Sequence, residues 1–471
     1  MKEEMRIESD SIGAMKVPKE AYYGVQALRA KQNFPISGRF LNSVFIENLA
    51  KIKKAAAITN RKINSLEGKK AEAIIEACDE VINGKFHDEF IVDAIQGGAG
   101  TSANMNMNEV IANVADELLG GNRGVYSKVH PNDHVNMSQS TNDVIPTAGK
   151  LTVIDLAKEL LKELEELEKE LINKSVEFDN VLKMGRTQLQ DAVPMRVGQT
   201  FHAYASMINR DKKRIENCLE EMYTLNLGGT AIGSGVNAEM GYIENIVPCL
   251  GEITGYPLTQ AKDLFDATQN LDGFVMVSGV LKACAVNLSK MCNDLRLLSS
   301  GPKTGIGELY LPERQNGSSI MPGKINPVIP EVVNQVAFHV IGHDTTITLA
   351  AEAGQMELNA FEPIVFYNLF ESLTMLKQAV ETLTNNCIKG IRVNKEKCLN
   401  MVNESTGIAT VLCPQIGYKK SAEIVKIALK TGKNVRTVVL ENGIMSEIAL
   451  TRALDPYAAT EWKEERKKAI S

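Results

Sequence analysis

The sequence predicts an all-α protein, a mainly helical chain of three domains with a central bundle of five long helices. One observation is length, because 471 residues exceed the size at which a single core keeps growing, so two or three domains or one very long bundle are expected. A second is a set of five stretches in which apolar residues recur with the helical period. A third is that Gly, Pro and Asn gather between helical patterns and mark loops there.

The first part of the chain mixes short helical patterns with loop-forming segments. Stretches such as "NFPISG", "QGGAGTSANMN" and "HPNDHVNMSQSTND" interrupt the helical period repeatedly. This pattern predicts a mostly helical N-terminal domain with long loops, which we place at residues 1–141.

The central part, residues 142–395, carries the five long helical patterns. In the first of them Leu160, Leu164, Leu167 and Leu171 follow in steps of four, three and four, with Glu and Lys on the opposite face. Helices of about 20 to 35 residues are roughly 30 to 50 Å long, which is typical of an elongated bundle. The five predicted helices are 151–178, 200–222, 264–298, 332–351 and 363–385.

The third predicted helix, 264–298, is apolar nearly all round and is therefore expected to be buried. Such a helix needs neighbours on every side, and its interleaved Ala, Gly and Ser residues allow contact with other subunits as well as with its own chain. Oligomerisation is the natural expectation. Beyond this central part the patterns shorten again, which predicts a small helical C-terminal domain at residues 396–471.

Charge and cysteine content restrict the function classes. Fifty-two basic and 58 acidic residues give a formal charge of −6 without a basic stripe, so the expected partner is a small molecule and not a nucleic acid. The eight cysteines are scattered without a C-x-x-C motif, which fits reduced thiols in the cytoplasm. The N-terminus "MKEEMRIESD" lacks the apolar stretch of a secretory signal. The longest apolar run, 273–288, is interrupted by Lys282 and too short to span a bilayer, so we expect a soluble protein with no membrane partner.

Four segments without a helical period are dense in neutral hydrogen-bonding side chains: 97–109, 130–143, 185–191 and 315–331. If these segments converge, their hydroxyl and amide groups, with added positive charge, form a pocket suited to carboxylates. The candidate site residues are Thr101, Ser140, Thr141, Asn142, Thr187, Gln188, Ser318, Ser319, Lys324 and Asn326.

The segment 315–331, "QNGSSIMPGKINPVIPE", is the most irregular of the four. Gly317 and Gly323 allow dihedrals that other residues resist, and three prolines break regular backbone hydrogen bonding, so an ordered or switchable loop is expected. Ser, Thr and Asn are also common helix caps and turn formers, so each segment alone has a structural interpretation. The coincidence of four such segments with a glycine-flanked serine pair and a nearby lysine favours function.

Other kinds of site have weaker support. Gly98, Gly100 and Ala103 satisfy the loose form of G-x-G-x-x-G/A, but no β-α-β alternation surrounds them, so a dinucleotide site is not expected. No G-x-S-x-G motif surrounds Ser318, and no H-E-x-x-H motif or other cluster of metal ligands is recognised. The six histidines are dispersed, and one such as His339 is expected to be a helix or core residue.

The stretch 317–327, "GSSIMPGKINP", resembles the signature of the aspartase/fumarase superfamily, G-S-x-x-M-x-x-K-x-N, and the resemblance extends over essentially the whole chain. Segments such as "GAGTSANMNMNEVIAN", "GRTQLQDAVP" and "AAEAGQMELNAFEP" resemble aspartate ammonia-lyases more than fumarases. Fumarases usually carry histidine at the position of Gln188 and "NPTQCEA" where this chain has "NPVIPEV". A class II fumarate hydratase is the nearest alternative, and a non-catalytic structural protein on the same fold is a more distant one.

The resemblance implies a quaternary structure. Members of the superfamily have three mainly helical domains, and their central five-helix bundles assemble into a twenty-helix core in a homotetramer. Their active sites are built from loops of three different subunits. By this resemblance the four polar segments meet only in the assembled tetramer.

The resemblance also implies a reaction, the reversible deamination of L-aspartate to fumarate and ammonia. The hard step is removal of a β-carbon proton beside a carboxylate, because the resulting enediolate needs preorganised donors. No cofactor is implied for this chemistry, and activation by a divalent cation is left open. The implied roles are Ser318 as general base, Thr101, Ser140, Thr141 and Ser319 for the β-carboxylate, Lys324 and Asn326 for the α-carboxylate, and Asn142, Thr187 and Gln188 around the amino group.

Overall fold

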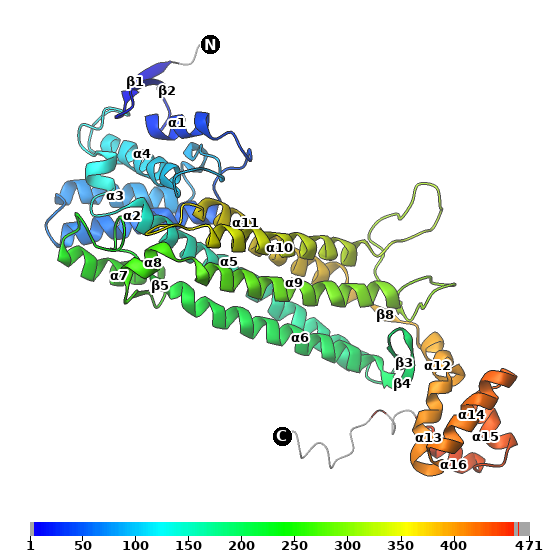
Figure 1. Ribbon diagram of the computed structural model, residues 1–471. Coiled ribbons are helices and arrows are strands. Elements are labelled where there is room, and N and C mark those ends of the chain that lie inside the picture. Colours follow the sequence, from blue (N-terminus) through cyan, green and yellow to red (C-terminus); the bar gives the residue numbers. More distant parts are fainter. Residues whose placement is uncertain (1–3, 456–459, 461–471) are drawn as a thin grey trace. The chain divides into compact units, whose positions relative to one another are not determined.

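The computed structural model describes residues 4–455 and residue 460, and the chain is mainly helical, as the sequence predicts (Figure 1). The described residues form two compact units, and each of the five long helices contributes residues to both. The predicted division into three domains stays a prediction. Unit 1 takes its residues from Met1–Lys162, Asp211–Val286 and Val336–Lys377, and unit 2 from Glu163–Arg210, Asn287–Gln335 and Gln378–Ser471.

The long helices overlap their predicted positions, with two corrections. The first helix begins at Thr141 and not at Leu151, so it includes the end of the segment 130–143 that was expected to be a loop. The predicted helix 264–298 is wrong as a single element, because it is interrupted at Asn270, whose backbone is extended. Asp263 caps the short helix before the break, and the apolar pattern continues across the break, so periodicity alone did not reveal it. The helices concerned are α5 (Thr141–Glu177), α6 (Val197–Cys218), α8 (Leu264–Gln269), α9 (Asp272–Leu298), α10 (Val328–Glu352) and α11 (Glu362–Asn386).

Helix α9 is less buried in the single chain than its composition predicts. Met276 is 52% exposed and Val286 is 50% exposed, so the expectation of full burial is not met by this chain alone. Among the described residues α9 is also the one helix long and apolar enough to cross a membrane, although half of its most apolar window is buried. Its Lys282 forms an ion pair of 2.6 Å with Asp344 on α10, which links the two helices.

Aromatic side chains pack the interior of unit 1. Phe366 on α11 lies 5.9 Å from Phe45 and 5.1 Å from Phe274, measured between ring centroids, which is within the range of favourable aromatic pairs. Gly149 on α5 makes this packing possible, because a Cβ atom there would lie 2.4 Å from the Phe366 ring. Other unit 1 elements are α2 (Ser43–Lys62), α3 (Gly68–Ile82), α4 (Thr101–Leu118), α7 (Met240–Thr254), β5 (Thr224–Leu225), β6 (Thr259–Gln260), a 3-10 helix at His87–Glu89, another at Leu219–Tyr223 and a π-helix at Pro131–Val135.

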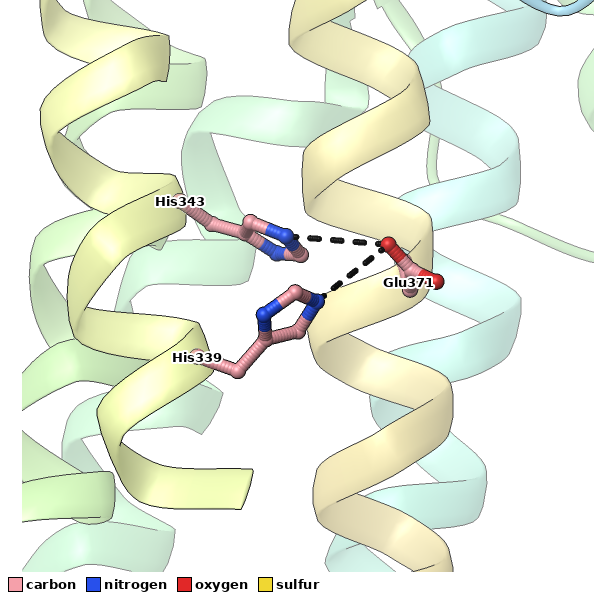
Figure 2. A group of neighbouring side chains, drawn as sticks. All are labelled: His339, His343 and Glu371. Carbon is pink, nitrogen blue, oxygen red and sulfur yellow. Dashed lines mark ion pairs between the residues drawn. The ribbon is translucent and has the colours of Figure 1, made fainter. Parts of the chain in front are cut away.

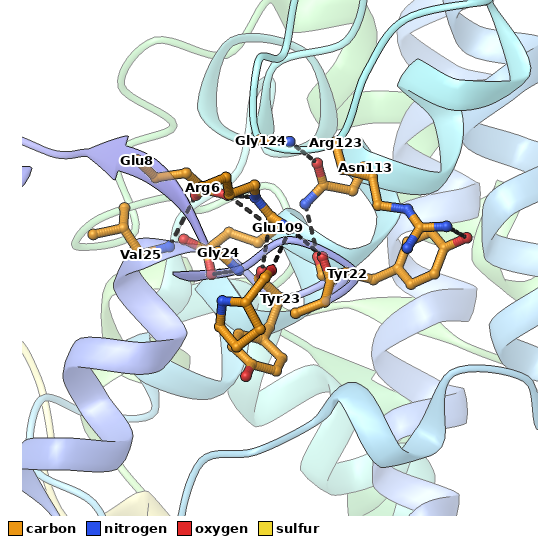
Figure 3. Close-up of polar contacts among 12 residues, drawn as sticks. Arg6, Glu8, Tyr22, Tyr23, Gly24, Val25, Glu109, Asn113, Arg123 and Gly124 are labelled. Atoms are coloured by element: carbon orange, nitrogen blue, oxygen red, sulfur yellow. Dashed lines mark hydrogen bonds and ion pairs between the residues drawn. The ribbon is translucent and has the colours of Figure 1, made fainter. Parts of the chain in front are cut away.

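A buried carboxylate anchors the N-terminal elements of unit 1 (Figure 3). Glu109 on α4 accepts the backbone N–H groups of Gly24, Gln26 and Ala27 over 2.8 to 3.1 Å. These three residues lie at the start of the helix that follows the N-terminal hairpin. These N–H groups have no partner within the helix, and the helix dipole favours a negative charge there. Burial nevertheless raises the pKa of Glu109 to about 7. Glu109 thus holds the start of α1 (Val25–Asn33). Glu8 on β1 (Met5–Ser9) accepts the backbone N–H of Val25 at 3.0 Å, and β1 pairs with β2 (Ala14–Pro18).

Unit 2 contains a β-hairpin that the sequence did not predict. The segment 185–191, expected to be a loop, forms the tip of two antiparallel strands whose register is Leu182 with Arg196 and Thr187 with Gln190. A bulge interrupts this pairing, and the two turn residues are neither Gly nor Asn, so the usual hairpin signal is missing from the sequence. The strands of unit 2 are β3 (Leu182–Thr187), β4 (Gln190–Arg196), β7 (Leu309–Tyr310) and β8 (Arg392–Val393).

The C-terminal helices of unit 2 pack around an apolar core. Val402, Leu412, Val438 and Leu450 are fully buried in this core. The predicted small helical region after residue 395 is therefore present among the described residues. It comprises α12 (Lys395–Glu404), α13 (Ala409–Ile416), α14 (Tyr418–Thr431), α15 (Val435–Glu441) and α16 (Glu447–Ala453), with a 3-10 helix at Thr406–Ile408. Another 3-10 helix, Ile388–Gly390, precedes it.

Candidate active site

The predicted site residues are divided between the two units. Unit 1 holds four of them and unit 2 holds six, and each set is described separately below. The unit 1 set is Thr101, Ser140, Thr141 and Asn142, and the unit 2 set is Thr187, Gln188, Ser318, Ser319, Lys324 and Asn326.

The start of α5 is a capping box. Ser140 Oγ accepts the backbone N–H of Asn142 at 3.2 Å, and Asp143 Oδ1 accepts the backbone N–H of Ser140 at 2.9 Å. The structural interpretation of "STND" as a capping sequence is therefore confirmed. A hydroxyl group that accepts in this way still has its proton to donate, so capping does not exclude Ser140 from binding an anion.

A fully buried lysine lies behind these residues. Lys53 on α2 directs its three N–H bonds at the amide oxygens of Asn104, Asn136 and Gln139, over 2.7, 2.9 and 2.9 Å. Burial lowers the pKa of Lys53 to about 7, against the opposing effect of the Asp143 carboxylate. Asp143 is itself buried, and burial raises its pKa to about 6.

The lysine is connected to Thr141 through one amide. Asn104 accepts from Lys53 and donates its own N–H to Thr141 Oγ1 at 3.3 Å. The Thr141 oxygen is thereby occupied as an acceptor, so its proton is free to be donated to a ligand. Hydrogen bonds linked in this way polarise one another, and a buried cation at the start strengthens the last donor.

Two other predicted residues lie at neighbouring helix starts in unit 1. Thr101 is the first residue of α4, so the segment 97–109, predicted as a loop, is a loop only up to Gly100. Thr101 is exposed and donates its hydroxyl to the Gly98 carbonyl at 2.8 Å. Asn142 donates its amide N–H to the Ala231 carbonyl at 2.7 Å, which holds the side chain and leaves the amide oxygen as an acceptor.

The segment 317–327 of unit 2, called the serine loop below, is folded on itself. The backbone N–H of Gly317 donates to the carbonyl of Lys324 at 2.8 Å, and the Asn326 amide donates to the carbonyl of Gly317 at 3.0 Å. Gly323 has a φ of +78°, as expected for a residue chosen for its dihedral freedom. Gly317 is needed for a different reason, because a Cβ atom there would lie 2.5 Å from the Lys324 carbonyl oxygen.

Ser318 Oγ accepts two backbone N–H groups within this loop, from Ile320 at 3.2 Å and from Met321 at 3.3 Å. Donors that already point at this oxygen stabilise negative charge on it. The next residue, Ser319, and Lys324 are exposed to solvent.

Thr187 and Gln188 lie exposed at the tip of the β3–β4 hairpin. Strand β3 is held along its length by Glu308, a buried carboxylate that pairs with Lys183 at 3.1 Å near the base of the hairpin and with Arg186 at 2.7 Å near its tip. Gln188 has a φ of +51°, an uncommon conformation for a non-glycine residue. Leu189 has a φ of +63°, and a two-residue hairpin turn of this type requires a positive φ at both central residues, so the turn accounts for this conformation.

A cavity of about 280 Å³ lies beside the unit 1 set, lined by Gly100 and Ile145 at the starts of α4 and α5. Most of its lining is apolar, including Phe45, Phe366 and Phe370. A dicarboxylate gains few hydrogen bonds from such a lining, so the cavity is not a substrate site for that class of ligand.

The sequence analysis missed Lys53. Leu49, Lys53 and Ala56 lie on one helical face, so the pattern already placed a lysine among apolar residues. A lysine at such a position is almost never buried without partners. Its partners come from Asn104, Asn136 and Gln139, which lie on other elements and could not be assigned to it from the sequence.

The sequence models of two families match this chain. The family described as "Lyase" matches residues 13–342, and the family described as "Fumarase C C-terminus" matches residues 408–461. A curated relative from Bacillus sp, named aspartate ammonia-lyase, is 49% identical over 98% of this chain and 98% of its own length.

Two solved structures have the same fold. One is titled fumarate lyase:delta crystallin from Brucella melitensis bound to cobalt; it has a TM-score of 0.95 and 48% identity, and the match covers 98% of this chain and 100% of that chain. The other is a recombinant class II fumarase from Schistosoma mansoni, with a TM-score of 0.92, 36% identity, and coverage of 96% and 98%. The chain therefore belongs to the aspartase/fumarase superfamily of lyases.

Proposed function

We propose that this chain is an aspartate ammonia-lyase, a carbon-nitrogen lyase that reversibly converts L-aspartate to fumarate and ammonia. The observation that carries the proposal is the 49% identity over 98% of both chains with a relative of that name. The class II fumarase from Schistosoma mansoni is only 36% identical, although its TM-score of 0.92 is close to the 0.95 of the structure from Brucella melitensis. The higher sequence identity to the aspartate ammonia-lyase than to the fumarase favours ammonia over water as the leaving group.

The β-carbon proton is removed by Ser318. A serine hydroxyl is a weak base unless its alkoxide is stabilised, and the N–H groups of Ile320 and Met321 that reach Ser318 Oγ support that state. Closure of the loop over the substrate excludes water and strengthens these interactions.

The proposed steps balance in atoms and charge. The Ser318 alkoxide takes the β-proton and becomes a hydroxyl, and the electrons of the C–H bond move into the β-carboxylate to form the enediolate. Their return forms the C=C bond and breaks the C–N bond, so that the ammonium group leaves as neutral ammonia. Ser318 then releases its proton, and the products are fumarate and an ammonium ion.

The β-carboxylate is held by hydroxyl donors that carry no charge of their own. Ser140 and Thr141 supply them from unit 1 and Ser319 from the serine loop, and Thr101 joins them when its hydroxyl turns from the Gly98 carbonyl to the ligand. Lys53 is a positioning residue in this arrangement, because it acts on Thr141 through the Asn104 amide and does not itself contact the substrate.

The other substrate groups are assigned by charge and by donor type. The α-carboxylate binds the Lys324 ammonium, which is an exposed cation, and the Asn326 amide, which is a neutral donor of the same loop. The substrate ammonium donates to the amide oxygens of Asn142 and Gln188 and to the Thr187 hydroxyl. Every group that this scheme uses is a protein side chain or backbone N–H, so the scheme requires no cofactor.

The active form is a cytoplasmic homotetramer whose sites combine residues from three subunits. Large apolar side chains that one chain leaves in solvent support an assembly of this kind. Phe338 and Leu349 on α10 are each 63% exposed, and Met276 on α9 is 52% exposed.

The test is a two-substrate assay with the purified protein. Fumarate absorbance is followed after addition of L-aspartate in one experiment and L-malate in another, without added cofactor. We expect fumarate from L-aspartate. Fumarate from L-malate alone contradicts the proposal and favours the class II fumarase reaction. If neither substrate gives fumarate in a protein shown to be tetrameric, the chain is a non-catalytic member of the superfamily.

A further inference from the structure

Two histidines and a glutamate meet between α10 and α11 of unit 1 (Figure 2). His339 and His343 are four residues apart on one face of α10, and Glu371 faces them from α11. Glu371 Oε2 lies 3.6 Å from the Nε2 atom of each histidine, and one ligand atom of each residue lies within 4.8 Å of the others.

A neighbouring serine orients one of the histidines. Ser372 Oγ donates its single proton to the Asn368 carbonyl at 2.7 Å, and the same oxygen lies 2.9 Å from His343 Nδ1. Nδ1 must then carry the proton of that contact, so neutral His343 directs the lone pair of Nε2 towards Glu371. Metal-binding histidines are usually fixed by a second hydrogen bond of this kind.

We propose that His339, His343 and Glu371 form a binding site for one divalent transition-metal cation of the Zn²⁺ class. Two imidazoles and one carboxylate are a common ligand set for Zn²⁺. With metal-ligand distances of about 2.0 to 2.2 Å, tetrahedral ligand atoms lie roughly 3.3 to 3.5 Å apart. The two 3.6 Å separations from Glu371 approach this value, and the third separation, between the two histidines, is within 4.8 Å, so binding requires the imidazoles to turn towards each other.

In the single chain the site is exposed to solvent and has an open coordination position. The side chain of His339 is 47% exposed and that of Glu371 is 27% exposed, and Glu371 also lines the apolar cavity of unit 1. Three protein ligands leave a fourth position for water or another donor. None of the three residues is assigned to the substrate, so the site is additional to the proposed active site.

The alternative is an interhelical ion pair without a metal. In that case protonated imidazoles would share the Glu371 carboxylate and the cluster would have no affinity for cations. The two explanations differ in a direct binding measurement, which does not depend on catalytic activity. A bound cation would cross-link α10 to α11 and raise the thermal unfolding temperature, because it binds only the folded protein.

The test uses the full chain, freed of metal by a chelator that is then removed, and Co²⁺ as the probe. Visible absorption of Co²⁺ reports ligand type and geometry, and Zn²⁺ is then used to displace it. We expect one Co²⁺ per chain, displacement by Zn²⁺ because Zn²⁺ binds such sites more tightly, and a higher unfolding temperature with either ion.

Three variants assign the site, and one serves as a control. Glu371→Gln and His339→Ala each remove a ligand and should weaken Co²⁺ binding by at least about 100-fold, while Ser372→Ala should weaken it by about 10- to 100-fold. The control is His202→Ala, which removes an exposed histidine elsewhere on the chain. The proposal is overturned if the parent protein binds less than one ion per chain, or if Glu371→Gln and His339→Ala bind as tightly as His202→Ala.

Discussion

Lys53 is the residue whose side chain does most to organise the unit 1 part of the site. Its ammonium is buried, and the three amide oxygens that surround it hold Asn104, Asn136 and Gln139 in fixed positions. An unpaired polar group in such an environment is costly, and removal of the cation takes the lysine donor from Asn104 and Gln139, while Asn136 still accepts from Asn104 and Asn108.

Lys53→Met should lower kcat/KM for L-aspartate by about 10- to 100-fold, because Thr141 loses the polarised amide that orients it. The matched control is Lys54→Met, which removes the neighbouring lysine and its ion pair with Asp79. Steady-state kinetics on both variants give the comparison. Equal losses in the two variants would show that the effect is one of general stability and not of the Thr141 contact.

Glu109 predicts a pH dependence of stability. Its pKa is raised by burial to about 7 in the folded protein, above its ordinary value of 4.5. Between these values the folded state holds a proton that the unfolded state has lost, so the contribution of Glu109 is present at low pH and is lost as the pH rises through 7.

Relative to Glu109→Gln, the parent should therefore lose on the order of 3 kcal/mol of unfolding free energy between pH 4.5 and pH 7. Urea unfolding of both proteins at several pH values measures this difference. Glu72→Gln, at an exposed carboxyl group, is the control. A difference between parent and Glu109→Gln that does not vary with pH contradicts the assignment.

At the scale of elements, the serine loop depends on close backbone contact. Gly317→Ala places a Cβ atom 2.5 Å from the Lys324 carbonyl oxygen and should displace the Ser318 hydroxyl. Misplacement by about 1 Å can cost about 100-fold in rate, so we expect kcat to fall by roughly that factor with little change in unfolding temperature. Gly68→Ala, where nothing lies within 4 Å of the added atom, is the control. Unchanged kcat in Gly317→Ala would remove the loop from the mechanism.

The long helices could be predicted because their apolar period persists over many turns. The break at Asn270 could not, because the apolar pattern continues across it and only the backbone conformation of Asn270 changes. The β3–β4 hairpin was missed because Gly185 and Pro194 are poor strand formers and its turn at Gln188 lacks Asn or Gly.

The candidate site residues were named from the sequence and stay a prediction, and the buried groups that hold them in place were not predicted. The segments "STND" and "GSSIMPGKINP" could be singled out because they are rich in polar side chains. Glu308 and Lys53 could not, because their partners are distant in sequence. The cluster of His339, His343 and Glu371 also depends on a partner that is distant in sequence. The H-x-x-x-H spacing of His339 and His343 was visible, but the sequence did not show that Glu371 lies opposite.

At the scale of the whole molecule, shared sites predict complementation. Ser318→Ala and Thr187→Ala chains should each be inactive alone, and hybrid tetramers should recover activity because some sites then combine two intact loops. The measurement is fumarate formation after the two proteins are dissociated, mixed and reassembled. Verified hybrids no more active than either parent would argue against sites shared between subunits.

The central claim is that Ser318 Oγ, held by the N–H groups of Ile320 and Met321, removes the β-proton of aspartate. The most direct measurement is fumarate formation by Ser318→Ala, with Ser43→Ala as a distant serine control and the oligomeric state checked for both. We predict that Ser318→Ala stays assembled and that its kcat falls by about 100- to 10,000-fold, the range typical of a lost general base. Near-normal turnover in that variant would contradict the account.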